Sequence, residues 1–208
     1  MLSAELKRRK GVPFKFEIGS GFLLLLALVY FFDDSGLLLA ALPAVAVHEL
    51  GHLLAMGLFG VRPLALSATM SGFSLDYSGS ISAPKEMLTA LAGPLLGLLF
   101  AVVCAKIGNR VQSEYLLLCA GLGVVLNAFN LLPALPLDGG RILSFFAFRV
   151  LGEAGAQKLV QALSLATALG LVVAGMYFLA NGQGGAPALA GVWILLMTIG
   201  EKGEVYCS

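Results

Sequence analysis

The chain has 208 residues, of which 59% are hydrophobic and 12% are charged. Soluble domains carry about 25% charged residues, so this composition excludes an ordinary water-soluble fold and indicates a polytopic membrane protein. The net charge of +1 gives no reason to expect nucleic acid as a partner. We therefore expect one membrane-embedded domain over residues 1–208.

Apolar runs of near membrane-spanning length predict an all-α polytopic fold with six transmembrane segments. A turn-rich stretch at 132–140 separates the fourth segment from a short predicted helix at 141–151. The predicted segments cover residues 18–32, 36–60, 86–107, 113–132, 156–180 and 187–200.

The distribution of basic residues predicts the orientation of these segments. A basic run, Lys7 to Lys10, precedes the first segment and favours a cytoplasmic N-terminus. With that orientation, both termini lie in the cytoplasm. Most of the remaining basic residues then also fall on the cytoplasmic side: Lys15, Arg62, Lys85, Arg141, Arg149, Lys158 and Lys202.

The connection between the second and third segments differs from the rest of the chain. Residues 61–85 are rich in Ser, Gly, β-branched and aromatic residues, and they alternate in part between polar and apolar. This pattern predicts a small membrane-associated β hairpin at about 61–83. It is either a simple connection or an edge strand that pairs with an extended substrate.

Both histidines of the protein lie in one pentapeptide, His48-Glu49-Leu50-Gly51-His52, inside an apolar run. Positions i and i+4 share one face of a helix, so both imidazoles can bind one zinc ion. Glu49 lies beside them and is free to act as a base. A polar cluster that merely joins helices would not need this spacing, and ionisable groups at membrane depth usually serve a function.

A catalytic zinc ion usually has three protein ligands, and no third histidine exists. Asp138 is the best candidate, because Pro133 and Pro136 interrupt the preceding helix while Gly139 and Gly140 allow sharp turns. The alternative is an ordinary surface turn at Asp138. The weaker rivals for the third ligand are Asp76, Glu86 and Glu114.

Asn130 lies eight residues before Asp138, near the end of the fourth segment. Its amide is suited to hydrogen-bond a substrate or to stabilise an oxyanion. The equally open alternative is a hydrogen bond between helices, shared with Asn127 one turn earlier.

Three motifs together resemble the site-2 protease family of intramembrane metalloproteases. They are HELGH at 48–52, Ala-Gly-Pro at 92–94 and NLLPALPLDGG at 130–140, and the likeness covers a core at 36–150. The resemblance implies that His48, His52 and Asp138 bind one zinc ion. It also implies that Glu49 is the catalytic acid and base, and that Asn130 takes part in catalysis.

The resemblance also implies a function, which is cleavage of a peptide bond in a membrane-spanning or membrane-associated segment of a substrate protein. The compact layout is most similar to the bacterial sporulation branch, which acts on membrane-tethered pro-sigma factors and often carries a C-terminal CBS domain. Residues 1–208 contain no such domain. We expect a location in the bacterial plasma membrane, with the lipid bilayer and a membrane-protein substrate as partners.

Two questions stay open. An inhibitory membrane partner or a homo-oligomer would each be compatible with this sequence. The alternative function is a metal-binding transporter or scaffold without peptidase activity, which would not need Glu49 as a proton carrier.

Overall fold

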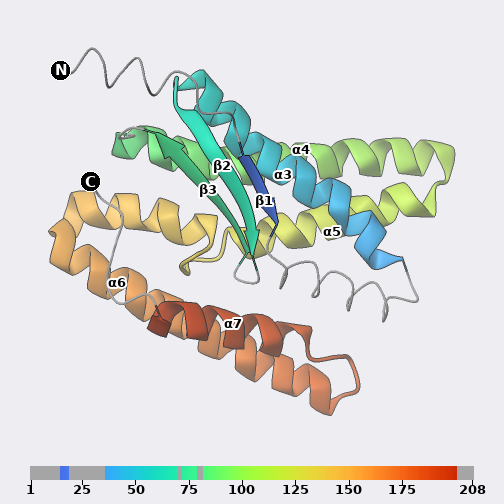
Figure 1. Cartoon of the computed structure of the whole chain (residues 1–208). Coiled ribbons are helices and arrows are strands. Elements are labelled where there is room, and N and C mark those ends of the chain that lie inside the picture. Colours follow the sequence, from blue (N-terminus) through green and yellow to red (C-terminus); the bar gives the residue numbers. More distant parts are fainter. Residues whose placement is uncertain (1–14, 19–35, 70–71, 79–81, 201–208) are drawn as a thin grey trace.

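The computed structural model describes residues 15–18, 36–69, 72–78 and 82–200. This part of the chain contains helices and a small sheet (Figure 1). The helices are α3 (Leu37–Leu58), α4 (Ala83–Val111), α5 (Glu114–Asn130), α6 (Asp138–Ala180) and α7 (Ala186–Gly200). The strands are β1 (Lys15–Ile18), β2 (Arg62–Thr69) and β3 (Gly72–Ser78).

Three described helices, α3, α4 and α6, are long and apolar enough to cross a membrane. Together they indicate an integral membrane protein. Helices α5 and α7 are apolar but shorter. The predicted first segment at 18–32 lies outside the described residues, apart from Ile18. The predicted count of six membrane crossings is therefore not confirmed.

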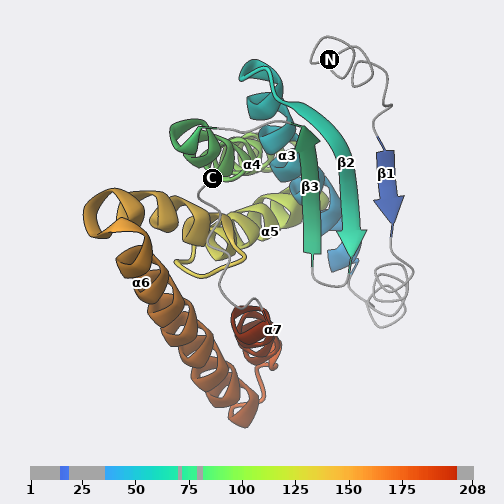
Figure 2. The ribbon, with the colours of Figure 1, turned by 60° about the vertical axis from the view of Figure 1, so that its left-hand side comes forward.

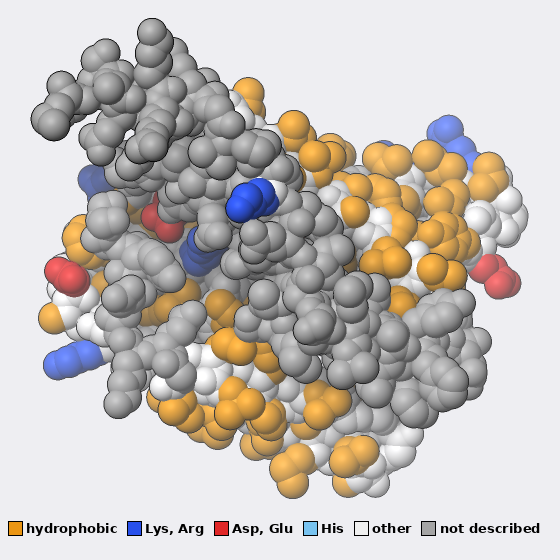
Figure 3. Space-filling view, in the orientation of Figure 1, with side chains coloured by type: hydrophobic (Ala, Val, Ile, Leu, Met, Phe, Trp, Pro, Cys, Tyr) orange, Lys and Arg blue, Asp and Glu red, His pale blue; other side chains and the backbone are white. Residues whose placement is uncertain are grey.

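Helices α3, α4 and α5 pack through small residues and turn large apolar side chains outward. The buried residues of α3 are small apart from one histidine and one methionine: Ala40, Ala44, His48, Gly51, Ala55 and Met56. The stripe of α4 includes Gly93, Gly97, Ala101 and Gly108. Hydrophobic side chains are prominent on the visible surface (Figure 3). This arrangement, with small residues between the helices and large apolar side chains on the outside, suits a lipid bilayer, where close van der Waals packing holds helices together.

The strands form one sheet in the order β1-β2-β3, which lies beside α3 (Figure 2). Strands β2 and β3 pair antiparallel inside the range predicted for the hairpin. Strand β1 pairs parallel to β2 through partners such as Lys15 and Ala65, and the sequence did not predict this third strand. Because β2 is central, β3 has an outer position among the described strands.

Helix α6 changes direction at Gly152, where φ is 70° and ψ is 179°. Only glycine adopts this conformation without strain. The two arms of α6 correspond to the helices predicted at 141–151 and 156–180, although α6 begins three residues earlier than predicted, at Asp138. The second arm pairs with α7 at small residues. A side chain at Gly191 would press on the Ala168 carbonyl, 2.6 Å from its oxygen.

Candidate metal centre

Helix α3 carries both histidines on the side that faces α4, α5 and the start of α6. His48 and His52 are one turn apart, and their Nε2 atoms are 3.2 Å from each other. Their rings meet edge to face, with centroids 4.9 Å apart. His48 occupies the buried stripe of α3, so helix packing fixes the depth at which the pair lies.

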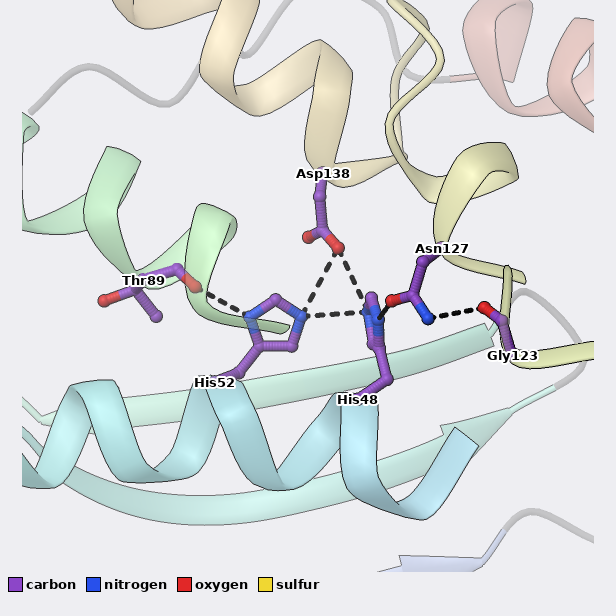
Figure 4. A network of polar contacts seen from close by, with 6 residues as sticks. All are labelled: His48, His52, Thr89, Gly123, Asn127 and Asp138. Atoms are coloured by element: carbon purple, nitrogen blue, oxygen red, sulfur yellow. Dashed lines mark hydrogen bonds and ion pairs between the residues drawn. The ribbon is translucent and has the colours of Figure 1, made fainter. Parts of the chain in front are cut away.

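Asp138 completes the cluster from the first turn of α6. Its Oδ2 atom lies 3.1 Å from Nε2 of His48 and 3.4 Å from Nε2 of His52 (Figure 4). Of the predicted rivals, Glu86 and Glu114 lie in the first turns of α4 and α5. Among the residues that the structure describes, the one group suited to hold a metal ion is His48, His52 and Asp138.

The loop before Asp138 is held by contacts with the rest of the protein. Ser164, on the second arm of α6, accepts a hydrogen bond from the Leu135 backbone N–H at 3.0 Å. The Leu135–Pro136 peptide bond is cis. The loop residues Ala134 and Leu137 are buried against Ala168 and Ile194. The helical hairpin of α6 and α7 therefore supports the segment that presents the carboxylate.

The two glycines after Asp138 have a different role from the predicted one. We expected Gly139 and Gly140 to allow sharp turns, but both lie in the first helical turn of α6. Their missing side chains instead let α6 approach the loop backbone. An added Cβ on Gly140 would lie 2.5 Å from the carbonyl carbon of Ala134, and one on Gly139 would overlap the carbonyl of Leu131.

Each histidine uses its other ring nitrogen to contact an oxygen atom. Nδ1 of His52 lies 2.8 Å from the Thr89 backbone carbonyl, and Nδ1 of His48 lies 2.9 Å from Oδ1 of Asn127. These oxygens accept hydrogen bonds, so each Nδ1 carries the proton. In a neutral imidazole the lone pair is then on Nε2. Both lone pairs are on the atoms nearest to the Asp138 carboxylate.

The donor set fits a zinc ion. Two Nε2 lone pairs and a carboxylate oxygen converge in a buried place, and Oδ2 of Asp138 accepts no hydrogen bond from the described residues. Such atoms repel one another unless a cation lies between them. Three N and O ligands with a fourth position left for water is the usual arrangement of catalytic zinc. The predicted cofactor agrees with this geometry.

The two predicted catalytic residues occupy different positions relative to this cluster. Glu49 is half-buried on α3 and lies within electrostatic range of both histidines, Asp138 and Arg141. Asn130 is half-buried at the last residue of α5, and no hydrogen bond joins it to the metal-binding side chains in the described part of the chain. Their catalytic roles stay predictions.

Sequence reasoning missed three contacts that shape the cluster. Asn127, treated as a helix-joining residue, contacts His48, and the Thr89 carbonyl contacts His52. Gly93 leaves the space that the His52 ring fills, since an added Cβ would overlap that ring. An Asn in an apolar run indicates that its side chain has a buried partner, but the sequence does not show which residue that partner is. A backbone carbonyl is present in every residue, so the sequence gives no indication that the carbonyl of Thr89 contacts a histidine.

Fold and site together define a helical membrane protein with a buried metal centre built from HExxH and an aspartate. Residues 105–174 match the sequence profile of peptidase family M50. The site-2 protease from Methanocaldococcus jannaschii has the same fold, with a TM-score of 0.70 at 21% identity over 93% of each chain. The predicted resemblance to the site-2 proteases is therefore confirmed.

Two curated relatives that match part of the chain carry zinc-metalloprotease names. A zinc metalloprotease of Methanocaldococcus jannaschii is 27% identical over 64% of this chain and 40% of the relative. Rip3 of Mycobacterium tuberculosis, whose name assigns it provisionally to the same class, is 28% identical over 72% of this chain and 42% of the relative. The chain thus spans less than half the length of these relatives.

Proposed function

We propose that this protein is an intramembrane zinc metalloprotease, which cleaves a peptide bond in a membrane-spanning or membrane-associated segment of another protein. The observation that carries the proposal is the meeting of His48, His52 and Asp138 on apolar, membrane-length helices with Glu49 beside them. One zinc ion per chain, held by these three side chains, would supply Lewis acidity to a water molecule and to the scissile carbonyl.

Glu49 is the proposed general base and acid. Its carboxylate takes a proton from the attacking water, whose oxygen bonds to the scissile carbonyl carbon. The proton then passes to the amine nitrogen as the C–N bond breaks, which leaves a carboxylic acid and an amine. Asn130 is the proposed hydrogen-bond donor to the carbonyl oxygen of the substrate. Its position one residue before the loop that carries Asp138 supports a place at the edge of the site.

The substrate must reach this site in an extended form, because a helix keeps its carbonyls in backbone hydrogen bonds. Strand β3 is the proposed docking edge, since it has an outer position in the described sheet and a substrate strand can pair with such an edge. The sheet lies beside α3, the helix that carries both histidines (Figure 2).

The finer parts of the proposal rest on the sequence. They are one domain over residues 1–208, six membrane crossings and cytoplasmic termini. A bacterial plasma membrane and release of a transcription factor such as a pro-sigma factor follow from the likeness to the sporulation branch.

The test compares the wild type with Glu49→Gln by co-expression with candidate single-span or hairpin substrates. We expect Glu49→Gln to lower the cleavage rate by about 10²–10⁴-fold, because a general base contributes that much. It should still bind zinc, because the ligand atoms are unchanged. The matched control is Glu153→Gln, an exposed carboxylate on α6, which should cleave like the wild type. Cleavage retained by Glu49→Gln would refute the mechanism.

A further inference from the structure

Asn127 lies at the centre of the helix bundle. Its side chain is fully buried, with 0% exposure, on the small-residue stripe of α5. Both ends of the amide have a partner. Nδ2 donates to the Gly123 backbone carbonyl at 2.6 Å, and Oδ1 is 2.9 Å from Nδ1 of His48 (Figure 4). A polar group buried this deeply in apolar surroundings is costly unless such partners are present.

These two contacts leave one arrangement of hydrogen atoms. The Gly123 carbonyl only accepts, so the NH₂ group of Asn127 must face it and the amide oxygen must face His48. That oxygen also only accepts, so Nδ1 of His48 must carry the proton. The lone pair of His48 then lies on Nε2, which is 3.1 Å from Oδ2 of Asp138. A backbone carbonyl of α5 thereby determines which nitrogen of His48 is free to bind a metal ion.

We propose that Asn127 is a positioning residue for the metal centre. It holds the His48 ring in the tautomer and rotation that direct Nε2 toward the site shared with His52 and Asp138. This inference rests on the proposed zinc site, but it concerns metal binding and not the cleavage step. Hydrogen-bond partners of metal-binding histidines act in this way in general, and losing one weakens metal affinity by about 10- to 100-fold.

Gly97 on α4 makes this position of the amide possible. A Cβ added there would overlap Oδ1 of Asn127 and would lie 2.5 Å from Nδ2 and 2.7 Å from the amide carbon. The amide therefore fills the space that a side chain at Gly97 would take. Gly97 and Asn127 act as a pair, in which the glycine on one helix admits the polar group of the other.

A role in helix packing alone makes a different prediction. Packing would be served equally well by leucine, which has the same number of side-chain heavy atoms and the same branch at Cγ as asparagine and suits an apolar bundle. The positioning role requires an oxygen acceptor at this place. Variants that keep or remove the acceptor while retaining the branched shape of the side chain therefore separate the two roles.

The first experiment measures zinc affinity of the purified full chain in detergent, by competition with a chromogenic chelator. Asn127→Leu should bind zinc about 10- to 100-fold more weakly. Asn127→Asp keeps an oxygen facing His48, and in its protonated form its hydroxyl can replace Nδ2 as the donor to the Gly123 carbonyl, so this variant should bind zinc more tightly than Asn127→Leu. The control is Thr198→Val, which removes a buried hydroxyl bonded within α7 and should leave affinity unchanged. A folded Asn127→Leu protein with wild-type affinity would overturn the proposal.

Cobalt(II) gives a second readout, since its visible absorption reports the number and kind of ligands. The wild type and Asn127→Asp should show the same spectrum. Asn127→Leu should show a changed band, because His48 can then rotate or change tautomer. An unchanged spectrum for folded Asn127→Leu would count against the positioning role.

The Gly97 variants test the proposal even if Asn127→Leu fails to fold. Gly97→Ala should weaken zinc binding in the wild-type background, because the new methyl group displaces the amide. In an Asn127→Ala background the space is free, so the same change should have no further effect on affinity. Equal losses in both backgrounds would show that Gly97→Ala acts through helix packing, and the proposal would be wrong.

The outcome is independent of the protease assay. If the wild type binds zinc but cleaves no substrate, the proposed function fails while the zinc affinities of the Asn127 variants still decide the positioning role. If the wild type cleaves and all Asn127 variants bind zinc equally, the positioning role fails alone.

Discussion

Gly93 on α4 faces the ring of His52, a proposed metal ligand, and this contact makes a sharp prediction for Gly93→Ala. The new Cβ would lie 2.9 Å from Cδ2 of His52 and would be closer still to Cε1 and Nε2. Carbon atoms in ordinary contact are about 3.5–4.0 Å apart, so the ring must retreat by about 1 Å or more. Zinc–nitrogen bonds are about 2.0–2.1 Å long and tolerate about 0.2 Å.

The ring cannot make this movement and keep its contacts. His52 is held by the Thr89 carbonyl on the same helix as Gly93, so a shift away from α4 also weakens that hydrogen bond. A misplacement of about 1 Å near reacting groups lowers rates by about 10²-fold. We therefore expect Gly93→Ala to lose most bound zinc at stoichiometric metal and to cleave at least about 10²-fold more slowly.

The assay measures zinc content and cleavage on protein that has been checked for helical content by circular dichroism. Gly57→Ala is the matched control, because it is on α3 near His52 and an added Cβ meets no atom within 4 Å. The control should be as active as the wild type and slightly more stable, since alanine favours a helix. Normal zinc content and activity in folded Gly93→Ala would refute the geometry of the His52 pocket.

Two further predictions concern the metal and the fold. Removing zinc with a chelator should abolish cleavage and lower the thermal stability, because the Asp138 carboxylate and the two histidine lone pairs then repel one another. Zinc at about 100 times its Kd should raise the free energy of unfolding by about 2.7 kcal/mol. A melting temperature that zinc does not change would contradict this. Gly152→Ala should lower the free energy of unfolding by about 1–3 kcal/mol, because φ is 70° there. Gly170→Ala is the control, since a Cβ added at Gly170 meets no atom within 4 Å. Equal free energies of unfolding for Gly152→Ala and Gly170→Ala, measured in denaturant, would rule out backbone strain at Gly152.

Part of the cluster of His48, His52 and Asp138 could be predicted, because spacing along the chain fixes the geometry of the two histidines. His48 and His52 are four residues apart on one helix, and this spacing alone places both rings on one face. Asp138 was a harder inference, because its position depends on how α6 returns to α3. The expected interruption before it was correct, while the start of α6 was placed three residues too late.

The supporting residues could not be predicted from local patterns. Asn127 and Asn130 are three residues apart on α5, and the sequence favoured Asn130 for the site. The inward-pointing amide is that of Asn127, and it fills the space left by Gly97, about thirty residues earlier on α4. The third strand, β1, was missed for a similar reason, since it pairs with β2 across a long stretch of chain.

Helix packing and metal geometry share the same residues in this protein. Gly51 lies one position before His52 on α3, and a Cβ added there would be 2.8 Å from the Cα atom of Gly93. Helices α3 and α4 therefore approach each other closely at the point where the His52 ring enters the space beside Gly93. Because lipid offers no hydrophobic gain for helix association, this close contact has to hold the two helices together. A change that separates α3 from α4 must then move His52 relative to Asp138. The stability of α3–α4 packing and the affinity for zinc should therefore fall together.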